Sequence, residues 1–267
     1  MSYVPLSPLD LTLAAALLII NAAISWLFRL RLEKSIAIGT VRMLVQLAFV
    51  ALILKYIFAQ TSPAWTALLA FVMVLAAGLE VVVRQHRSFR GLHAWTFSTA
   101  TLLFVGMTIT GLGVGGIIAP DPWYAPRYIL PILGMVLGNT MTAMTLVLNT
   151  FSEAATRDRA AIEARLALGA ERFQALNGIL THALRTGMIP ILNSMATTGI
   201  VALPGMMTGQ ILAGISPVEA AKYQVLIMFL IASATSLGSF CAGVGAVLLL
   251  TDKRHRLRLD RLAPPAA

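Results

Sequence analysis

Long apolar segments recur along this chain, and short polar stretches separate them. The apolar segments cover about residues 9–28, 36–58, 63–83, 94–118, 128–150, 187–213 and 221–250. Each is close to the roughly 20 residues that a helix needs to cross about 30 Å of hydrocarbon. In lipid, every backbone polar group must find its partner within its own segment, so helices are expected. The pattern predicts an all-α, polytopic transmembrane helix bundle with about seven spans, forming a single transmembrane domain over residues 1–267.

The composition supports a lipid environment. Of the 267 residues, 58% are hydrophobic and 12% are charged, and the mean hydropathy is +0.83. An ordinary soluble domain has roughly 45–50% apolar and about 25% charged residues. A soluble fold of this length could not bury so much apolar surface, so the lipid bilayer is an expected partner.

The basic residues are distributed unevenly between the predicted loops. Sixteen of the 20 Lys and Arg residues follow the first, third, fifth and seventh apolar segments. The positive-inside bias places these loops in the cytoplasm, which predicts an outer N-terminus and a cytoplasmic C-terminus. The formal charge of +9 therefore indicates membrane topology, and no nucleic-acid partner is expected. No basic residue precedes the first apolar segment, so a cleaved signal peptide is not expected.

One long predicted cytoplasmic stretch, at about residues 151–186, has the pattern of an amphipathic helix. Its apolar residues recur at helical spacing between charged ones. Gly169 interrupts the pattern, which predicts two short helices. Three interpretations compete: a helix lying in the headgroup layer, a simple linker, and a docking element for a cytoplasmic partner.

Within this stretch, the run E-A-R-L-A-L-G-A from Glu163 to Ala170 resembles the EAA loop of ABC-transporter permeases. The glycine follows the glutamate by six positions, while Arg165 replaces the last residue of the triplet and no Leu-Pro follows at the usual distance. The resemblance implies a coupling helix that sits in a groove of an ATP-hydrolysing subunit. The residues it assigns to coupling are Glu163, Ala164, Leu168, Gly169 and Ala170.

A second motif lies downstream, where Asn193-Ser194-Met195 precedes the run G-I-V-A-L-P-G-M-M-T-G-Q-I-L-A-G over residues 199–214. It resembles the signature of the FetB-type permease family, which comprises bacterial iron export permeases and related plant aluminium-tolerance permeases. The resemblance covers most of the chain. It implies the permease subunit of an ABC exporter for iron or another metal ion, working as a homodimer with a separate cytoplasmic ATPase in the bacterial inner membrane.

The chain itself is not expected to hydrolyse ATP. It contains no GxxxxGK[ST] phosphate loop and no soluble stretch long enough for a nucleotide-binding domain. We expect no cofactor on this chain, and ATP and Mg²⁺ are expected on the partner ATPase.

Independently of the resemblance, Leu203-Pro204-Gly205 should kink or unwind the sixth span, because proline removes an intrahelical hydrogen bond. Broken helices at membrane depth are common where transporters bind substrate, and a purely structural kink is the equally favoured alternative. Neutral polar residues nearby could line a path or hold helices together. The residues predicted for gating or translocation are Asn139, Asn193, Thr197, Leu203, Pro204, Gly205, Met206, Met207, Thr208 and Gln210.

Two further features concern charge and metal binding. Arg42, in the second span, is predicted to form a structural ion pair with Glu80 or to extend toward the headgroups. The chain has 12 methionines, many in the fifth and sixth spans. Thioether sulfur suits copper(I) and not hard iron or aluminium ions, and apolar packing is the favoured interpretation. The sequence identifies no metal ligands.

Three other functions remain open. An ABC permease could carry a small organic molecule such as a nucleotide sugar. A membrane-embedded enzyme is disfavoured, because no acid/base or metal constellation converges in the spans. A membrane interaction protein without transport is the third alternative.

Overall fold

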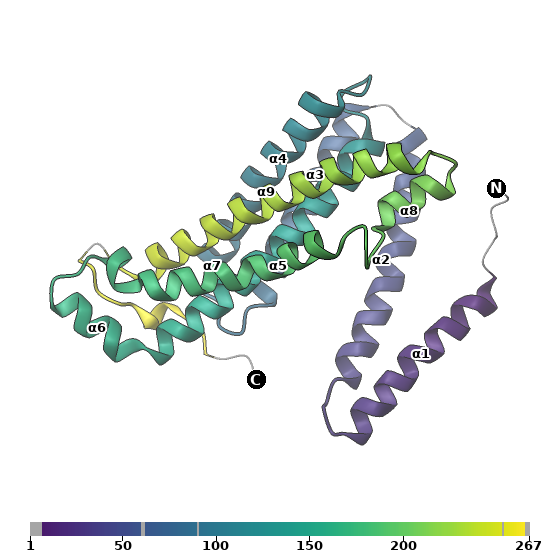
Figure 1. Ribbon diagram of the computed structural model, residues 1–267. Helices are drawn as coiled ribbons and strands as arrows, with labels where there is room; N and C mark the ends of the chain where they lie inside the picture. The colour runs from purple at the N-terminus through teal and green to yellow at the C-terminus, as the bar shows by residue number, and fades with distance from the viewer. Residues whose placement is uncertain (1–6, 60–61, 90, 253, 265–267) are drawn as a thin grey trace. The chain divides into compact units, whose positions relative to one another are not determined.

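The computed structural model describes residues 7–59, 62–89, 91–252 and 254–264, and most of them are helical (Figure 1). Within these residues β-structure is limited to isolated bridges. The chain divides into two compact units, Met1–Thr61 and Ser62–Ala267. The predicted all-α membrane bundle is confirmed, whereas its description as a single domain stays a prediction.

The first unit is a helical hairpin of α1 (Pro8–Leu27) and α2 (Glu33–Ala59). Ser25 holds the turn between them: its side chain is 2% exposed, and its Oγ accepts a hydrogen bond from the Leu32 amide at 2.9 Å. Both helices are long and apolar enough to cross a membrane. They match the first two predicted spans.

The second unit contains four more helices of this kind. They are α3 (Pro63–Val83), α4 (Leu92–Gly111) with its π-helical extension η1 (Leu112–Ile118), α5 (Pro126–Arg157) and α9 (Pro217–Leu250). Proline occupies the first turn of α3, α5 and α9, where no intrahelical hydrogen bond is lost. Six described helices are therefore candidate spans by length and composition.

The sixth predicted span, at residues 187–213, is not one continuous helix. Its first part belongs to α7 (Arg172–Thr197), and its last part forms the short helix α8 (Gly205–Leu212). Thr198 leaves the helix with extended backbone, and Gly199 has a φ of +92°. The average hydropathy of the segment conceals this interruption, because the residues of the break are themselves apolar.

Helix α5 is central in the second unit and lies against α3, α4, α7 and α9. Glycines allow the closest approaches. At Gly187 of α7, an added Cβ would lie 3.0 Å from the Ala143 carbonyl oxygen and would overlap the Val147 side chain of α5. At Gly238 of α9, it would overlap the Thr140 side chain. Small residues of this kind permit dense helix packing in lipid, where van der Waals contact drives association.

One end of the second unit gathers the segments whose basic residues predict a cytoplasmic location. In the loop after α3, the His86 amide donates to Asn149 Oδ1 of α5 at 2.9 Å. In the C-terminal segment, the Ala263 amide donates to the Ser88 carbonyl at 2.8 Å. Figure 1 shows α6 (Arg159–Ala167) at this end and α8 at the opposite end. The side of the membrane that each end faces stays a prediction.

Candidate functional site

The predicted coupling segment forms a helical elbow, which we define as α6 and the turn at residues 168–171. The Gly169 amide donates to the Leu166 carbonyl at 3.0 Å, and the Ala170 amide donates to the Arg165 carbonyl at 3.1 Å. This hydrogen-bond pattern ends a helix with a left-handed residue, and Gly169 has a φ of +93°. Glycine suits the position because it lacks a Cβ.

The prediction that Gly169 separates two helices is confirmed, but the second helix is not short. α7 continues from Arg172 through Pro190 to Thr197. At the other side, α5 continues to Arg157, so that only α6 is a separate element of the predicted 151–186 stretch. A polar beginning and an apolar continuation make α7 look like two elements in the sequence.

The elbow has a buried anchor and an exposed tip. Ile162 of α6 is 2% exposed, and the Arg165 guanidinium donates to the Ala175 carbonyl of α7 at 3.3 Å. On the exposed side, Glu163 pairs with Arg159 at 2.8 Å. Leu168 lies at the tip of the turn with 89% of its surface exposed. Ala164 and Gly169 are also exposed, whereas Ala170 is half-buried. The tip therefore offers an apolar side chain next to a rigid turn.

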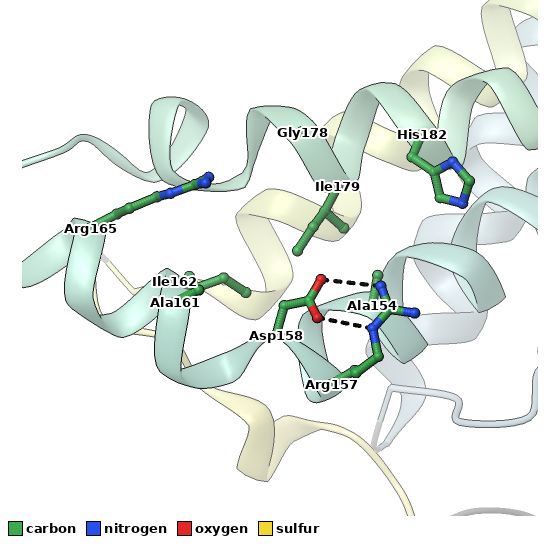
Figure 2. Close-up of a pocket in the computed structure, with 9 residues that line it drawn as sticks. All are labelled: Ala154, Arg157, Asp158, Ala161, Ile162, Arg165, Gly178, Ile179 and His182. Atoms are coloured by element: carbon green, nitrogen blue, oxygen red, sulfur yellow. Dashed lines mark hydrogen bonds and ion pairs between the residues drawn. The ribbon is translucent and has the colours of Figure 1, made fainter.

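A pocket of about 270 Å³ lies between α5, α6 and α7 (Figure 2). Arg157 and Asp158 form a two-point ion pair at its edge, with distances of 2.9 and 3.1 Å. The hydrogen bond from Arg157 lowers the pKa of Asp158. Figure 2 shows Ile162 and Ile179 extending toward each other from α6 and α7. The space beside these two side chains leaves α6 less tightly packed than a core helix.

The break between α7 and α8 lies at the end of α7 that is opposite the elbow. Thr197 Oγ1 donates to the Asn193 carbonyl at 2.9 Å, and both residues are exposed. Asn139 of α5 is also exposed, and its Nδ2 donates to the Met135 carbonyl at 2.8 Å. Thr197 and Asn139 thus donate within their own helices, and the roles of all three residues in a translocation path stay predictions.

The chain between α7 and α8 forms a tight turn. The Gly199 amide donates to the Ala202 carbonyl at 2.9 Å, and the Ala202 amide donates to the Thr197 carbonyl at 3.2 Å. Pro204 then caps α8 with extended backbone, and Thr208 Oγ1 donates to its carbonyl at 3.1 Å. The predicted interruption at residues 203–205 is present, and it begins five residues earlier than Leu203.

We expect Gly199→Ala to lower the melting temperature of the purified protein. At its φ of +92°, a Cβ strains the backbone, and a left-handed conformation costs an L-residue roughly 1–2 kcal/mol. Gly205→Ala is the matched control, because Gly205 begins a helix and an added Cβ there meets nothing within 4 Å. Thermal unfolding in detergent measures both variants. Equal melting temperatures would contradict the strained turn.

A pocket of about 210 Å³ lies between the end of α7 and α9. It is lined by Met195, Thr198, Gln224, Val225, Met228 and Phe229. The Gln224 side chain is 6% exposed, and its Oε1 accepts no hydrogen bond from any described residue. A buried amide oxygen without a partner is costly and calls for an explanation. We refer to this cavity as the Gln224 pocket.

Gln224 was not among the predicted site residues, although it is a polar residue inside an apolar segment. Its significance depends on burial and on the neighbouring break in α7, which only the structure shows. Gln210, which was predicted, also has a buried Oε1 that accepts no hydrogen bond from the described residues. Leu203 is 61% exposed, and Met206 and Met207 are half-buried.

The remaining charge and metal predictions have mixed outcomes. Glu80 accepts a hydrogen bond from Arg84 one turn along α3, at 3.0 Å. The predicted Arg42–Glu80 pair joins different units of the chain and stays a prediction. Across the described residues, no group of three or more His, Cys, Asp or Glu side chains could hold a metal ion. Met135, Met188 and Met206 pack against the hydrophobic core cluster of α4, α5, α7 and α9, as the packing interpretation predicts.

These features define the chain as a polytopic helical membrane protein with a broken helix at one end of its larger unit and a helical elbow at the other. A family model described as "Uncharacterised protein family (UPF0014)" matches residues 8–249, and the chain belongs to this family.

The chain is 33% identical to the "Probable iron export permease protein FetB" of Escherichia coli, over 95% of each chain. It is 35% identical to the "UPF0014 membrane protein YjkA" of Bacillus subtilis, over 83% of this chain and 86% of the relative. It is 32% identical to "Protein ALUMINUM SENSITIVE 3" of Arabidopsis thaliana, over 85% of this chain and 81% of the relative. The resemblance to the FetB-type family is thereby confirmed. No solved structure matches the chain.

Proposed function

We propose that this chain is the permease subunit of an ATP-driven ABC exporter, with iron or another metal ion as its cargo. In this proposal two copies work with a separate cytoplasmic ATPase in the bacterial inner membrane, and ATP and Mg²⁺ bind to the ATPase. The observation that carries the proposal is the elbow, with Leu168 exposed at its tip. The name of the Escherichia coli relative supports the choice of cargo.

The elbow is suited to transmit movement. α7 starts at the elbow and runs without interruption to the break at Thr197, beside the Gln224 pocket. A displacement of α6 by the ATPase would therefore reach the break at Thr197 through one continuous helix. The pocket between α5, α6 and α7 provides space for such a displacement.

The Gln224 pocket is the proposed cargo site. It combines the unpartnered Gln224 oxygen with the thioethers of Met195 and Met228. The amide oxygen is a hard donor that suits iron, and the thioethers are softer donors. All three groups are neutral, so they would hold a cation weakly, which suits a site that must release its cargo.

We expect Gln224→Leu to reduce metal-stimulated ATP turnover of the complex by about tenfold, a change of about 1.4 kcal/mol. Its melting temperature should stay the same or rise, because removing a buried amide oxygen without a partner removes a desolvation penalty. Gln85→Leu is the matched control. Gln85 is also 6% exposed, and its amide has no hydrogen-bond partner among the described residues, but it lies in the loop after α3. Equal turnover in the two variants would exclude the Gln224 pocket from the cargo path.

The proposed function is tested by co-expressing the chain with candidate ATPases and measuring ATP turnover in liposomes. Stimulation by Fe²⁺ supports the metal exporter. Stimulation by a nucleotide sugar alone would assign an organic cargo. Failure of every candidate ATPase to associate would favour a membrane interaction protein without transport.

A further inference from the structure

A strongly basic pocket of about 360 Å³ lies beyond the end of α9. Four arginines line it: Arg172 at the start of α7, and Arg254, Arg256 and Arg261 in the C-terminal segment. The same pocket includes the carboxylate of Asp252 and the apolar side chain of Leu248. Neither the elbow nor the Gln224 pocket contains these residues.

Hydrogen bonds join the C-terminal segment to α7 and α9 around this pocket. The Arg258 amide donates to the Leu250 carbonyl of α9 at 2.8 Å. The Arg261 guanidinium donates to the Leu249 carbonyl, also at 2.8 Å. The Arg172 amide donates to His255 Nδ1 at 3.1 Å, which ties the segment to α7. The pocket therefore lies at the junction of α7, α9 and the C-terminal segment.

The lining of the pocket carries more positive than negative charge. Hydrogen bonds from the Arg256 and Arg254 backbone amides lower the pKa of Asp252 to about 2, so this carboxylate is ionised near neutral pH. Arg256 neutralises it through an ion pair of 2.7 Å. No ion pair joins Arg172 or Arg254 to a carboxylate within the residues that the structure describes. These two guanidinium groups provide the donors for an anion.

The position of the pocket favours a lipid as the source of that anion. α9 is a candidate membrane span that ends at Leu250, so the arginines that follow it are expected near the headgroups. Leu248 lies in the last turn of the span and is 43% exposed. An amphiphile could thus place its phosphate among the arginines and its acyl chain along Leu248. Arg also matches phosphate geometry, because its fork donates two parallel hydrogen bonds.

We propose that this pocket binds the phosphate of an anionic phospholipid headgroup. The bound headgroup would bridge the start of α7 and the segment that follows α9, and so it would stabilise the base of the elbow. The proposal concerns residues outside the proposed cargo path and does not depend on the identity of the cargo.

Native mass spectrometry of the full-length protein tests this site with phosphatidylglycerol, phosphatidylcholine and inorganic phosphate as separate probes. We expect the protein to retain phosphatidylglycerol in preference to phosphatidylcholine. Arg172→Gln/Arg254→Gln should weaken this retention by at least about tenfold, since it removes the two guanidinium groups that no carboxylate of the described residues neutralises. Phosphatidylglycerol should also raise the melting temperature of the wild type more than that of the variant.

Arg29→Gln/Arg31→Gln is the matched control, because it removes the same charge from the α1–α2 turn, which the sequence also predicts to be cytoplasmic. It should retain the lipid. If both double variants lose phosphatidylglycerol equally, general surface charge explains the binding, and the proposal is overturned. Binding of inorganic phosphate without a preference for phosphatidylglycerol would overturn the lipid assignment. Arg254→Gln alone, which keeps the backbone hydrogen bonds of the segment, serves if the double variant unfolds.

Discussion

Replacing Leu168 by aspartate is expected to prevent stable association of this chain with its ATPase. Leu168 is 89% exposed at the tip of the elbow, where the proposed function places the ATPase groove. A central apolar anchor of an interface contributes about 2 kcal/mol or more, and an aspartate would have to be desolvated in the same position. We therefore expect at least about a 30-fold loss of affinity, measured by co-purification and by ATP turnover of the complex.

Leu92→Asp is the control for this change. Leu92 is 75% exposed at the start of α4, which follows the basic loop after α3, and it lies outside the elbow. Its replacement introduces the same charge at the same end of the second unit, and the ATPase should remain bound. If Leu168→Asp leaves both association and turnover intact, the elbow is not the coupling element.

Gly187→Leu is expected to destabilise the whole bundle. The new side chain would have to displace the Val147 side chain and would meet the Ala143 carbonyl, which belongs to the backbone of α5 and cannot move independently. Overpacking of this kind typically costs about 1–3 kcal/mol, and the loss should be at the upper end because α5 is central to the unit. Thermal unfolding in detergent and the monodisperse fraction on gel filtration measure the effect.

Gly178→Leu is its matched control, since Gly178 lies in the same helix and an added Cβ meets nothing within 4 Å. Leucine also has a higher helix propensity than glycine, so this variant should be as stable as the wild type or more so. If both variants unfold at the same temperature, the close approach of α5 and α7 is not what stabilises the bundle.

The sequence predicted the membrane helices well because their length and hydropathy follow from the bilayer itself. α3 matches its predicted span from Pro63 to Val83, and α4 with η1 ends at Ile118 as predicted. The C-terminal end of α5 could not be predicted from hydropathy, because its last turns leave the apolar segment while the helix continues to Arg157. Hydropathy reports where a chain leaves lipid, and helices do not have to end there.

The two ends of α7 differ in how well the local sequence predicts where the helix begins or ends. Gly169 could be predicted as an interruption because glycine is the residue that tolerates its positive φ. The break after Thr197 begins before the proline that predicted it, since Gly199 and the hydrogen bonds of the turn decide where the helix ends. The Gln224 pocket could not be predicted at all. It depends on two helices that meet in space, and a single sequence contains no such contact.

The central claim is that ATP hydrolysis by a partner drives a metal ion through this chain, and flux in proteoliposomes tests it most directly. The purified complex would be reconstituted with ATP on the elbow side, and a fluorescent chelator in the opposite compartment would report Fe²⁺. We predict ATP-dependent accumulation of Fe²⁺ that requires both chains and disappears with Leu168→Asp. Active ATP hydrolysis in the assembled complex without movement of Fe²⁺, or equal movement without the ATPase, would contradict the account.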